Sequence, residues 1–256
     1  MNKVRAIMTR PYKGKMFKIT PLSPYNAFQL TPEHPVLAVK RKDVSIQKKN
    51  RPKHWLAETN SKKLLEAKPQ YVPTGELEVG DFLVFPKIFA TNTTALTKEQ
   101  LALLGWYLAE GSTYWNKALN MPVVSFSLGS YETARIAEVE KLIWKVSGKK
   151  ACKTFDKTKK GVNIIVYSQE LQDFCLQFCG KGSATKILSK ELMDLPWEQV
   201  KPLIDSYFEG DGSVYKKGRT MVRASTASEQ LARQMQELLA RGGYYASIQV
   251  RKGSED

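Results

Sequence analysis

The chain has 256 residues, enough for two domains, and its 40 Lys and Arg against 25 Asp and Glu give a formal net charge of +15. Apolar runs stay well short of the ~18 residues that a membrane span needs, and the first residues lack the pattern of a signal peptide. We therefore expect no membrane association. The positive charge favours a polyanionic partner, most often nucleic acid, although solvated lysines alone would give the same composition.

Three cysteines, Cys152, Cys175 and Cys179, do not form an even disulfide framework. Cys175 and Cys179 lie one helical turn apart in an apolar stretch. A zinc site there would need two further ligands, and the chain has only two histidines, His34 and His54. We expect buried thiols and an intracellular, reducing location, either cytoplasmic or organellar.

Residues 1–96 contain 17 Lys and Arg against 7 Asp and Glu, a net charge of +10, so this part carries most of the excess. Short β-rich runs separated by Pro, Gly and Asn predict strands at 17–20, 27–31, 35–39 and 82–85, with a short helical turn at 62–66. Basic residues between these strands predict charged loops or hairpin tips at Lys40, Arg41, Lys42, Lys48, Lys49 and Arg51.

Residues 91–96 have the composition of a linker, and Thr97 and Gln100 form a predicted capping box for a helix that ends at Gly111. Beyond it the pattern predicts helix, strand, strand, helix, strand, strand, helix. The defined segments are a strand at 123–128, a helix at 131–146, a hairpin of 151–155 and 162–167, and a helix at 171–178.

The pattern then restarts with a helix at 196–208, strands at 214–215 and 220–224, a helix from Thr226 to Ala240 and a strand at 244–252. Compared with the first half, a strand and a final helix are missing. We expect the truncated half to leave a sheet edge and apolar surface unprotected, so that a second polypeptide or a further C-terminal segment completes it.

Two stretches, 103–112 and 204–213, repeat one pattern: an apolar helix that ends in a small residue, a carboxylate, a glycine and a serine. Glu110 and Asp211 are the two carboxylates. Gly105 and Ser206 lie five residues before them and allow another backbone to approach closely. If these faces pack together, the helices run parallel and both acids arrive at the same end. The glycine after each acid lets the chain leave the helix at once.

Two converging carboxylates with exposed backbone carbonyls provide the oxygen ligands that Mg²⁺ prefers, and on a basic protein they suit phosphodiester hydrolysis. The alternative is that both acids merely end their helices. An acid at a helix C-terminus is unfavourable by ~0.3–1 kcal/mol. Two acids at matched positions therefore favour a functional role.

These motifs resemble those of the LAGLIDADG, or dodecapeptide (DOD-type), homing endonucleases, particularly the intein-associated branch. The resemblance covers about residues 97–252 and rests on 105–112, 207–213, the intervening 182–188 that holds Lys186, and 226–231. It implies an α+β fold with a pseudo-two-fold αββαββα repeat, a first half at 97–190 and a truncated second half at 191–256.

The resemblance also implies roles for individual residues. Glu110 and Asp211 would bind the metal together with the carbonyls of Ala109 and Gly210, and Lys186 would lie beside the scissile phosphate. The cofactor would be Mg²⁺, with Mn²⁺ or Ca²⁺ able to substitute. Ser206 stands where the family usually has glycine, which is a mild change. Glu110 in place of Asp is common in this branch and should still bind metal.

In this family the strands form a saddle over the major groove of double-stranded DNA with a long recognition site. The candidate DNA-binding residues of this region are Lys153, Lys157, Lys159, Lys160, Lys216, Lys217, Arg219, Arg223, Arg251 and Lys252. The six basic residues between the N-terminal strands are further candidates, through nonspecific phosphate contacts.

Residues 31–37, with 55–57 and 79–86, are similar to blocks of the Hint splicing domains of inteins. There, the equivalents of Thr31 and His34 activate the N-terminal peptide bond. The nucleophile at the first residue and the terminal His-Asn pair of that family are not found here. We therefore interpret residues 1–90 as a Hint-like remnant in which Thr31 and His34 are vestigial.

The predicted function is a site-specific, metal-dependent double-strand DNA homing endonuclease. Three alternatives stay open. The scaffold could serve as a DNA- or RNA-binding module, it could act as an intron maturase, or the chain could be a fragment of a split intein.

Overall fold

The computed structural model describes residues 6–21, 27–46, 58–85, 92–156, 160–217 and 219–251. The chain divides into two compact units, Met1–Pro86 and Lys87–Asp256, which are described separately. Among the described helices, none has both the length and the apolar character needed to cross a membrane.

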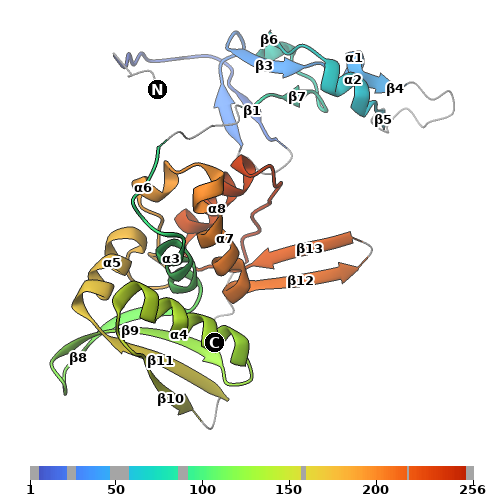
Figure 1. Ribbon diagram of the computed structural model, residues 1–256. Helices are drawn as coiled ribbons and strands as arrows, with labels where there is room; N and C mark the ends of the chain where they lie inside the picture. Colours follow the sequence, from blue (N-terminus) through green and yellow to red (C-terminus); the bar gives the residue numbers. More distant parts are fainter. Residues whose placement is uncertain are drawn as a thin grey trace. The chain divides into compact units, whose positions relative to one another are not determined.

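The first unit is built from short antiparallel strands (Figure 1). Its central strand β3 (Pro35–Val39) lies between β6 (Gln70–Pro73) and β7 (Phe82–Leu83). Two further pairs join β1 (Phe17–Ile19) to β2 (Phe28–Leu30) and β4 (Ser45–Ile46) to β5 (Glu58–Thr59). The strands predicted at 17–20, 27–31, 35–39 and 82–85 are thus present, most of them with shorter ends.

The prediction of a loop was wrong at Arg41 and Lys42, because Arg41 begins the short helix α1 (Arg41–Val44), whereas Lys40 lies just before it outside any helix or strand. Its backbone N–H donates to the Asp81 carboxylate at 2.9 Å, so an acid forty residues away caps this helix. The other helical segments of the unit are α2 (Ser61–Glu66), close to the turn expected at 62–66, and the 3₁₀ turn η1 (Thr74–Glu76).

The first half of the second unit has the expected order of helix, strand, strand, helix, strand, strand and helix. The elements are α3 (Lys98–Glu110), β8 (Gly111–Asn116), β9 (Met121–Gly129), α4 (Thr133–Ser147), β10 (Cys152–Asp156), β11 (Gly161–Tyr167) and α5 (Gln169–Cys179). The predicted capping box of α3 is formed by Thr97 and Gln100. The four strands make one antiparallel sheet in the order β10-β11-β9-β8.

One face of this sheet packs against α4 and α5 (Figure 1). Val124, Phe126, Ile164 and Val166 alternate along β9 and β11 on that face and are at most 1% exposed. The opposite face carries Ser127, which donates to Asn163. The register adds Ser112, Tyr114, Asn116, Met121, Val123, Ser125, Cys152, Thr154, Ile165 and Tyr167 to this face. The described side chains of the helix-free face are therefore mostly hydroxyl and amide groups.

The second half begins after α6 (Lys190–Met193) and contains α7 (Trp197–Asp211), β12 (Gly212–Lys217), β13 (Arg219–Ala224) and α8 (Glu229–Arg241). The start of α8 differs from the prediction, because Ser228 and not Thr226 caps its first turn. The strand predicted at 244–252 was wrong for the described residues up to 251. Gln236 of α8 donates to the Ala246 carbonyl and Tyr244 donates to Leu239, so the segment turns back onto the helix.

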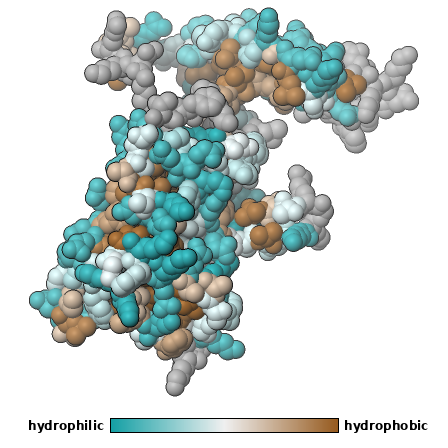
Figure 2. All heavy atoms as spheres, in the orientation of Figure 1, coloured by the Kyte–Doolittle hydropathy of each residue, from teal (hydrophilic) through white to brown (hydrophobic). Residues whose placement is uncertain are grey.

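The β12–β13 hairpin is more exposed to solvent than the first-half sheet. Among the described residues β13 pairs with β12 alone. Val214 and Val222 are 59% and 53% exposed, whereas Thr113 and Val124, at the corresponding positions of β8 and β9, are 6% and 0% exposed. Figure 2 shows hydrophobic side chains on the surface of this hairpin. Exposed apolar surface was expected here.

The core of the second unit is a single apolar cluster that includes residues of α3, α4, α5, α7, α8 and the first-half sheet. Cys175 and Cys179 lie inside it, as expected for buried thiols, and Cys152 is exposed. Burial raises the pKa of Cys175 to about 12, so this thiol is neutral and unreactive.

Candidate active site at the paired ends of α3 and α7

Small residues bring α3 and α7 into backbone contact. A Cβ atom on Gly105 would lie 2.2 Å from the carbonyl oxygen of Leu203 and 2.9 Å from Cβ of Ser206. One turn later, a Cβ atom on Gly210 would lie 2.6 Å from Cβ of Ala109. Because contacts on both helices advance in the same direction, α3 and α7 run parallel and end together.

Each helix passes directly into a strand at the glycine that follows its acid. Gly111 and Gly212 have φ angles of −84° and −81°, so the reason is not a left-handed backbone. A Cβ on Gly111 would lie 2.5 Å from Cα of Tyr107, and one on Gly212 would lie 1.9 Å from the Phe208 carbonyl oxygen. Only glycine leaves room for the chain to turn so sharply against the last helical turn.

The two carboxylates lie at this shared end and interact. Glu110 and Asp211 are partly buried, and Cγ of Glu110 lies 3.4 Å from the Cβ position of Gly210. Burial raises the pKa of Asp211 to about 6. The pKa of Glu110 is raised too, first by burial and then by the negative charges of Asp211 and Glu132. Two carboxylates that have lost hydration in this way form a favourable place for a cation.

Lys186, the lysine implied by the resemblance, is buried at the end of α3. Its side chain is only 6% exposed, and its ammonium donates to the carbonyl oxygens of Tyr107 at 2.6 Å, Leu108 at 3.0 Å and Gly111 at 2.7 Å. Burial lowers the pKa of this lysine, while nearby negative groups, among them Asp211 and Glu110, oppose that shift. The structure therefore places Lys186 under the C-terminal turn of α3, close to both acids.

A second contact ties the same turn to the segment before Lys186. The buried hydroxyl of Tyr107 donates to the Gly180 carbonyl at 2.8 Å and lies 3.4 Å from the Thr113 hydroxyl. Burial raises the pKa of Tyr107 to about 12, so the phenol stays protonated and acts as a donor. Tyr107 belongs to the first sequence motif, but its partner Gly180 is brought near it only by the tertiary fold.

An ion-pair network beside Glu110 was not predicted. Arg135 of α4 donates to the Glu209 carboxylate at 2.8 Å and pairs with Glu132. Glu132 also accepts a hydrogen bond from the backbone N–H of Gly129 at 2.7 Å. Arg135 thus links α4 to the last turn of α7, and its positive charge acts on Glu110. Glu209 lies within the second motif, yet nothing local indicates its partner.

The donor set at the helix ends suits a hard divalent cation. The described residues include no group of three or more His, Cys, Asp or Glu side chains that could hold a metal ion. A cation here would therefore rely on two carboxylates, with backbone carbonyls such as those of Ala109 and Gly210, and on water or substrate oxygens. Mg²⁺ is commonly bound in proteins by one or two carboxylates together with phosphate and water.

The candidate DNA-binding lysines of the first half have different environments. Lys153 is paired in register with Ile164, so it points to the helix-covered face, where its ammonium lies 3.0 Å from Glu140 of α4. Lys160 is exposed at the end of the β10–β11 hairpin. Lys157 and Lys159 lie outside the described residues.

The β12–β13 hairpin provides the clearest cationic surface. Arg223 lies over the ring of Tyr215 at 4.7 Å, and both belong to the face that corresponds to the helix-free face of the first sheet. Lys216 is exposed on the opposite face, and Arg251 is exposed beyond α8. The side chains of Lys217 and Arg219, and all of Lys252, lie outside the described part of the chain.

The N-terminal basic residues are only partly available. The Lys40 ammonium lies 2.6 Å from the Asp81 carboxylate, 2.8 Å from the Glu76 carbonyl and 3.9 Å from Glu78. Arg41 is partly buried in α1, and Lys42 is exposed. Lys48, Lys49 and Arg51 lie outside the residues that the structure describes.

The two residues interpreted as vestigial splicing groups lie at one turn. The His34 N–H donates to the Thr31 carbonyl at 3.1 Å, and the His34 carbonyl accepts from the N–H and hydroxyl of Thr74, both at 2.9 Å. The backbone of this turn is therefore fixed to η1, while the imidazole of His34 is exposed.

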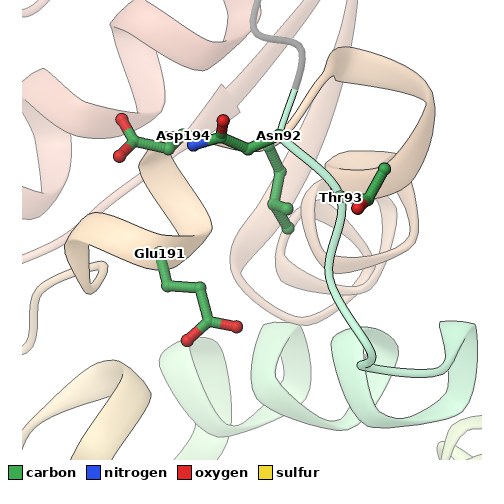
Figure 3. A pocket seen from close by; sticks show the side chains of 5 residues that line it. Asn92, Thr93, Glu191 and Asp194 are labelled. Atoms are coloured by element: carbon green, nitrogen blue, oxygen red, sulfur yellow. The ribbon is translucent and has the colours of Figure 1, made fainter.

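A polar hollow of about 500 Å³ lies elsewhere in the second unit. Asn92 and Thr93 from the segment before α3 line it together with Glu191, Asp194 and Leu195 at α6 (Figure 3). The Thr94 hydroxyl donates to the Glu191 carboxylate at 3.1 Å, and the Thr94 backbone N–H donates to the Gln199 side chain of α7 at 3.4 Å. Residues 92–96 are therefore held against the second unit. The hollow holds none of the predicted site residues.

Comparison with curated proteins identifies relatives much longer than this chain. It is 33% identical over 253 residues to iron-sulfur cluster assembly SufBD family proteins of Mycobacterium tuberculosis and Mycobacterium bovis, covering 98% of this chain and 30% of each relative. It is 25% identical over 276 residues to an uncharacterized protein of Methanocaldococcus jannaschii, covering 94% of this chain and 33% of that protein. The chain thus spans about a third of the length of these relatives.

Two solved structures share weak similarity. The I-LtrWI LAGLIDADG homing endonuclease bound to target DNA gives a TM-score of 0.28 at 13% identity, covering 49% of this chain and 65% of that one. Full-length DUF199/WhiA from Thermatoga maritima gives 0.24 at 14% identity, covering 60% and 58%. The sequence of residues 198–256, which begin in α7, matches the family described as LAGLIDADG-like domain. Over residues 198–256 the chain is therefore similar to the LAGLIDADG-like domain family.

Proposed function

We propose that this chain is a metal-dependent, site-specific endonuclease that cleaves both strands of DNA, of the homing type. The observation that carries the proposal is the pair of carboxylates, Glu110 and Asp211, at the joined ends of two parallel helices. Burial raises the pKa of both groups, which makes a divalent cation a favourable neighbour. The family match at residues 198–256 includes Asp211 and its motif.

Each part of the site has a defined task in this proposal. Bound Mg²⁺ would supply an activated water and stabilise the leaving oxygen of the phosphodiester. Glu110 and Asp211 hold the cation, and the contact between α3 and α7 sets the separation of their carboxylates. A phosphate contact from Lys186 is not part of the proposal, because its ammonium already donates to three carbonyl oxygens.

The helix-free face of the first sheet is proposed to meet the DNA. Its serine, asparagine and tyrosine side chains donate and accept hydrogen bonds, as reading base edges requires. The Arg223 and Tyr215 pair lies on the corresponding face of the β12–β13 hairpin and adds a cation for phosphate. The net charge of +15 supports attraction to a polyanion at long range.

The Hint-like origin of the first unit is also a proposal. It is supported by the β-rich unit at 1–86 and by the turn that holds Thr31 and His34 against η1. An intein-like insertion would account for a match that covers only 30% of relatives named for iron-sulfur cluster assembly. We do not propose that assembly function for this chain, since Cys175 and Cys179 are buried in its core.

Completion of the second half is a related proposal. Val214 and Val222 are exposed where their first-half counterparts Thr113 and Val124 are covered. A further hairpin and helix, from a second polypeptide or from more of the same protein, would cover them as β10, β11 and α5 complete the first half. Mass spectrometry of the native complex from its source would detect a second polypeptide.

The function is tested by incubating the protein with a plasmid library and Mg²⁺ and sequencing the linear products. Cleavage at a defined site is expected from the wild-type protein and not from Asp211→Asn or Glu110→Gln. The control is Asp173→Asn, which removes an exposed carboxylate on α5 and should cleave normally. DNA binding without cleavage by the wild-type protein would contradict the proposal and favour a nucleic-acid-binding module.

A further inference from the structure

The segment between α5 and α6 is fastened to the end of α3 at two points. Tyr107 of α3 donates to the Gly180 carbonyl, and Lys186 returns three hydrogen bonds to carbonyls of α3 and Gly111. The segment is held in turn by α8, because the Gln234 amide pairs with both backbone groups of Leu188 at 2.7 and 2.8 Å. It therefore connects the catalytic end of α3 to the second half.

The Lys186 ammonium is fully used by these contacts. A protonated lysine has three N–H donors, and each of the three carbonyls is within 3.0 Å. Carbonyls in the last turn of a helix lack a helical partner, as at Leu108, whereas the Tyr107 carbonyl also accepts from the N–H of Gly111. A cation there also opposes the negative end of the helix dipole. Lys186 meets both needs while remaining 6% exposed.

The two helix ends differ in this respect. Among the described residues, no side chain donates to a carbonyl of the last turn of α7, from Tyr207 to Asp211. The positive charge of Lys186 acts on both Glu110 and Asp211, but its hydrogen bonds fix only the backbone beside Glu110. The acids are therefore alike in sequence and unlike in how firmly their backbone is held.

We propose that Lys186 is a positioning residue: it locks the last turn of α3, so that the Glu110 carboxylate and the Ala109 carbonyl are oriented before a cation binds. The Asp211 end is positioned by helix packing and by the ion pair of Arg135 with Glu209, which does not reach its backbone carbonyls. Lys186 thus acts through Glu110 and makes the two halves of the site unequal. The orientation of Glu110 for a cation rests on the proposed metal-dependent function. The hydrogen bonds of Lys186 to the last turn of α3 do not depend on that proposal.

The lock is tested by hydrogen exchange measured by mass spectrometry on the metal-free protein. Lys186→Met removes the three donors and keeps the length of the side chain. Exchange of amides in residues 107–114 should rise on the order of tenfold, with little change in the last turn of α7. The matched control is Lys181→Met, which removes the same charge from an exposed position of the same segment. Equal exchange in the two variants would overturn the lock.

Lys186→Gln serves as a second variant if Lys186→Met does not fold. Its amide keeps two N–H donors, so exchange should fall between that of the wild-type protein and that of Lys186→Met. The proposal would again be overturned if a folded Lys186→Gln protein exchanged at the wild-type rate. Where Lys186→Met can also be measured, it would have to show no effect as well.

The route of action is tested by Mn²⁺ binding, measured by calorimetry in two backgrounds. Lys186→Met should weaken binding several-fold in Asp211→Asn, where Glu110 remains, and leave it unchanged in Glu110→Gln. A general loss of structure would weaken both equally, and that result would contradict action through Glu110. Absence of Mn²⁺ binding by the wild-type protein would instead overturn the proposed function and the positioning of a metal ligand, while the exchange experiment still decides whether the lock exists.

Discussion

At position 105, a single hydrogen atom in place of a side chain decides how closely two helices approach. The Leu203 carbonyl would lie 2.2 Å from a Cβ there, far inside contact distance. The contact joins the backbone of α3 to the backbone of α7, so there is no flexible side chain that could move aside for a methyl group. The same limit at Gly210 involves Ala109, whose carbonyl is a proposed metal ligand, so packing and chemistry share these positions.

Gly105→Ala should lower the free energy of unfolding by at least ~1–2 kcal/mol, because the helices must separate to admit the methyl group. Helix propensity alone predicts the opposite sign, a gain of up to about 1 kcal/mol. The matched control is Gly161→Ala, where the nearest atom to a new Cβ is the Leu128 carbonyl at 3.7 Å. Urea denaturation of both variants decides the matter, and a stabilised Gly105→Ala protein would contradict the close contact.

The raised pKa of Asp211 makes stability depend on pH. Its pKa rises from 3.8 to about 6 on folding, so the folded state binds more protons than the unfolded state between these values. The contribution of Asp211 to stability therefore falls as pH rises through this window and stays low above it.

Without metal, Asp211→Asn should accordingly raise the melting temperature more at about pH 8 than at about pH 4. Added Mg²⁺ should stabilise the wild-type protein at the higher pH and stabilise the variant, which keeps only Glu110, to a smaller extent. Asp173→Asn, at an exposed carboxylate, should show no such trend. A gain from Asp211→Asn that did not change with pH would argue against the buried carboxylate.

At the scale of whole elements, strand register decides which cations face a nucleic acid. Lys153 and Arg223 are both basic residues on hairpin strands, but the register turns Lys153 toward α4 and Arg223 toward the helix-free face. Lys153 is then paired with Glu140, while Arg223 lies on the ring of Tyr215. From composition alone, Lys153 and Arg223 would be equally good candidates for contact with DNA.

Arg223→Ala should therefore weaken DNA binding and reduce the slope of log affinity against log salt by about 1. Lys153→Ala removes the same charge and should leave both quantities nearly unchanged. Fluorescence anisotropy with labelled duplex DNA over a range of salt concentrations measures them. Equal losses in the two variants would show that net charge, and not the face of the hairpin, determines binding.

At the scale of the molecule, the apolar core is distributed unequally between the two units. The principal cluster lies wholly within the second unit, from Leu101 to Leu238. Among the described residues of the first unit, the buried hydrophobic side chains are only Ala38, Val39, Val44 and Val72. A unit with so few buried side chains gains little from hydrophobic burial.

A fragment of residues 87–256 should thus fold by itself and unfold cooperatively, within a few degrees of the main transition of the full chain. Residues 1–86 alone should be marginally stable. Differential scanning calorimetry of the full chain and both fragments measures this. A fragment 87–256 that lacked a cooperative transition would show that the first unit is needed for folding.

Local patterns in the sequence determined most of the second unit. The capping box at Thr97 and Gln100, the 3.6-residue periodicity of its helices and the hairpin of β10 and β11 each depend on neighbours in the chain. The repeated motif likewise indicated where Glu110 and Asp211 stand, because the pattern of small residues predicts parallel packing. The final strand at 244–252 failed because a strand needs a partner that local sequence cannot supply.

What only the tertiary structure decided are the contacts between residues far apart in the chain. The cap on α1 comes from Asp81, the network beside Glu110 comes from Arg135, and the ammonium of Lys186 lies under α3 instead of facing outward. The sequence marked both acids and the lysine as one site. The fold determined their unequal support, because buried donors must find acceptors wherever packing brings carbonyls within reach.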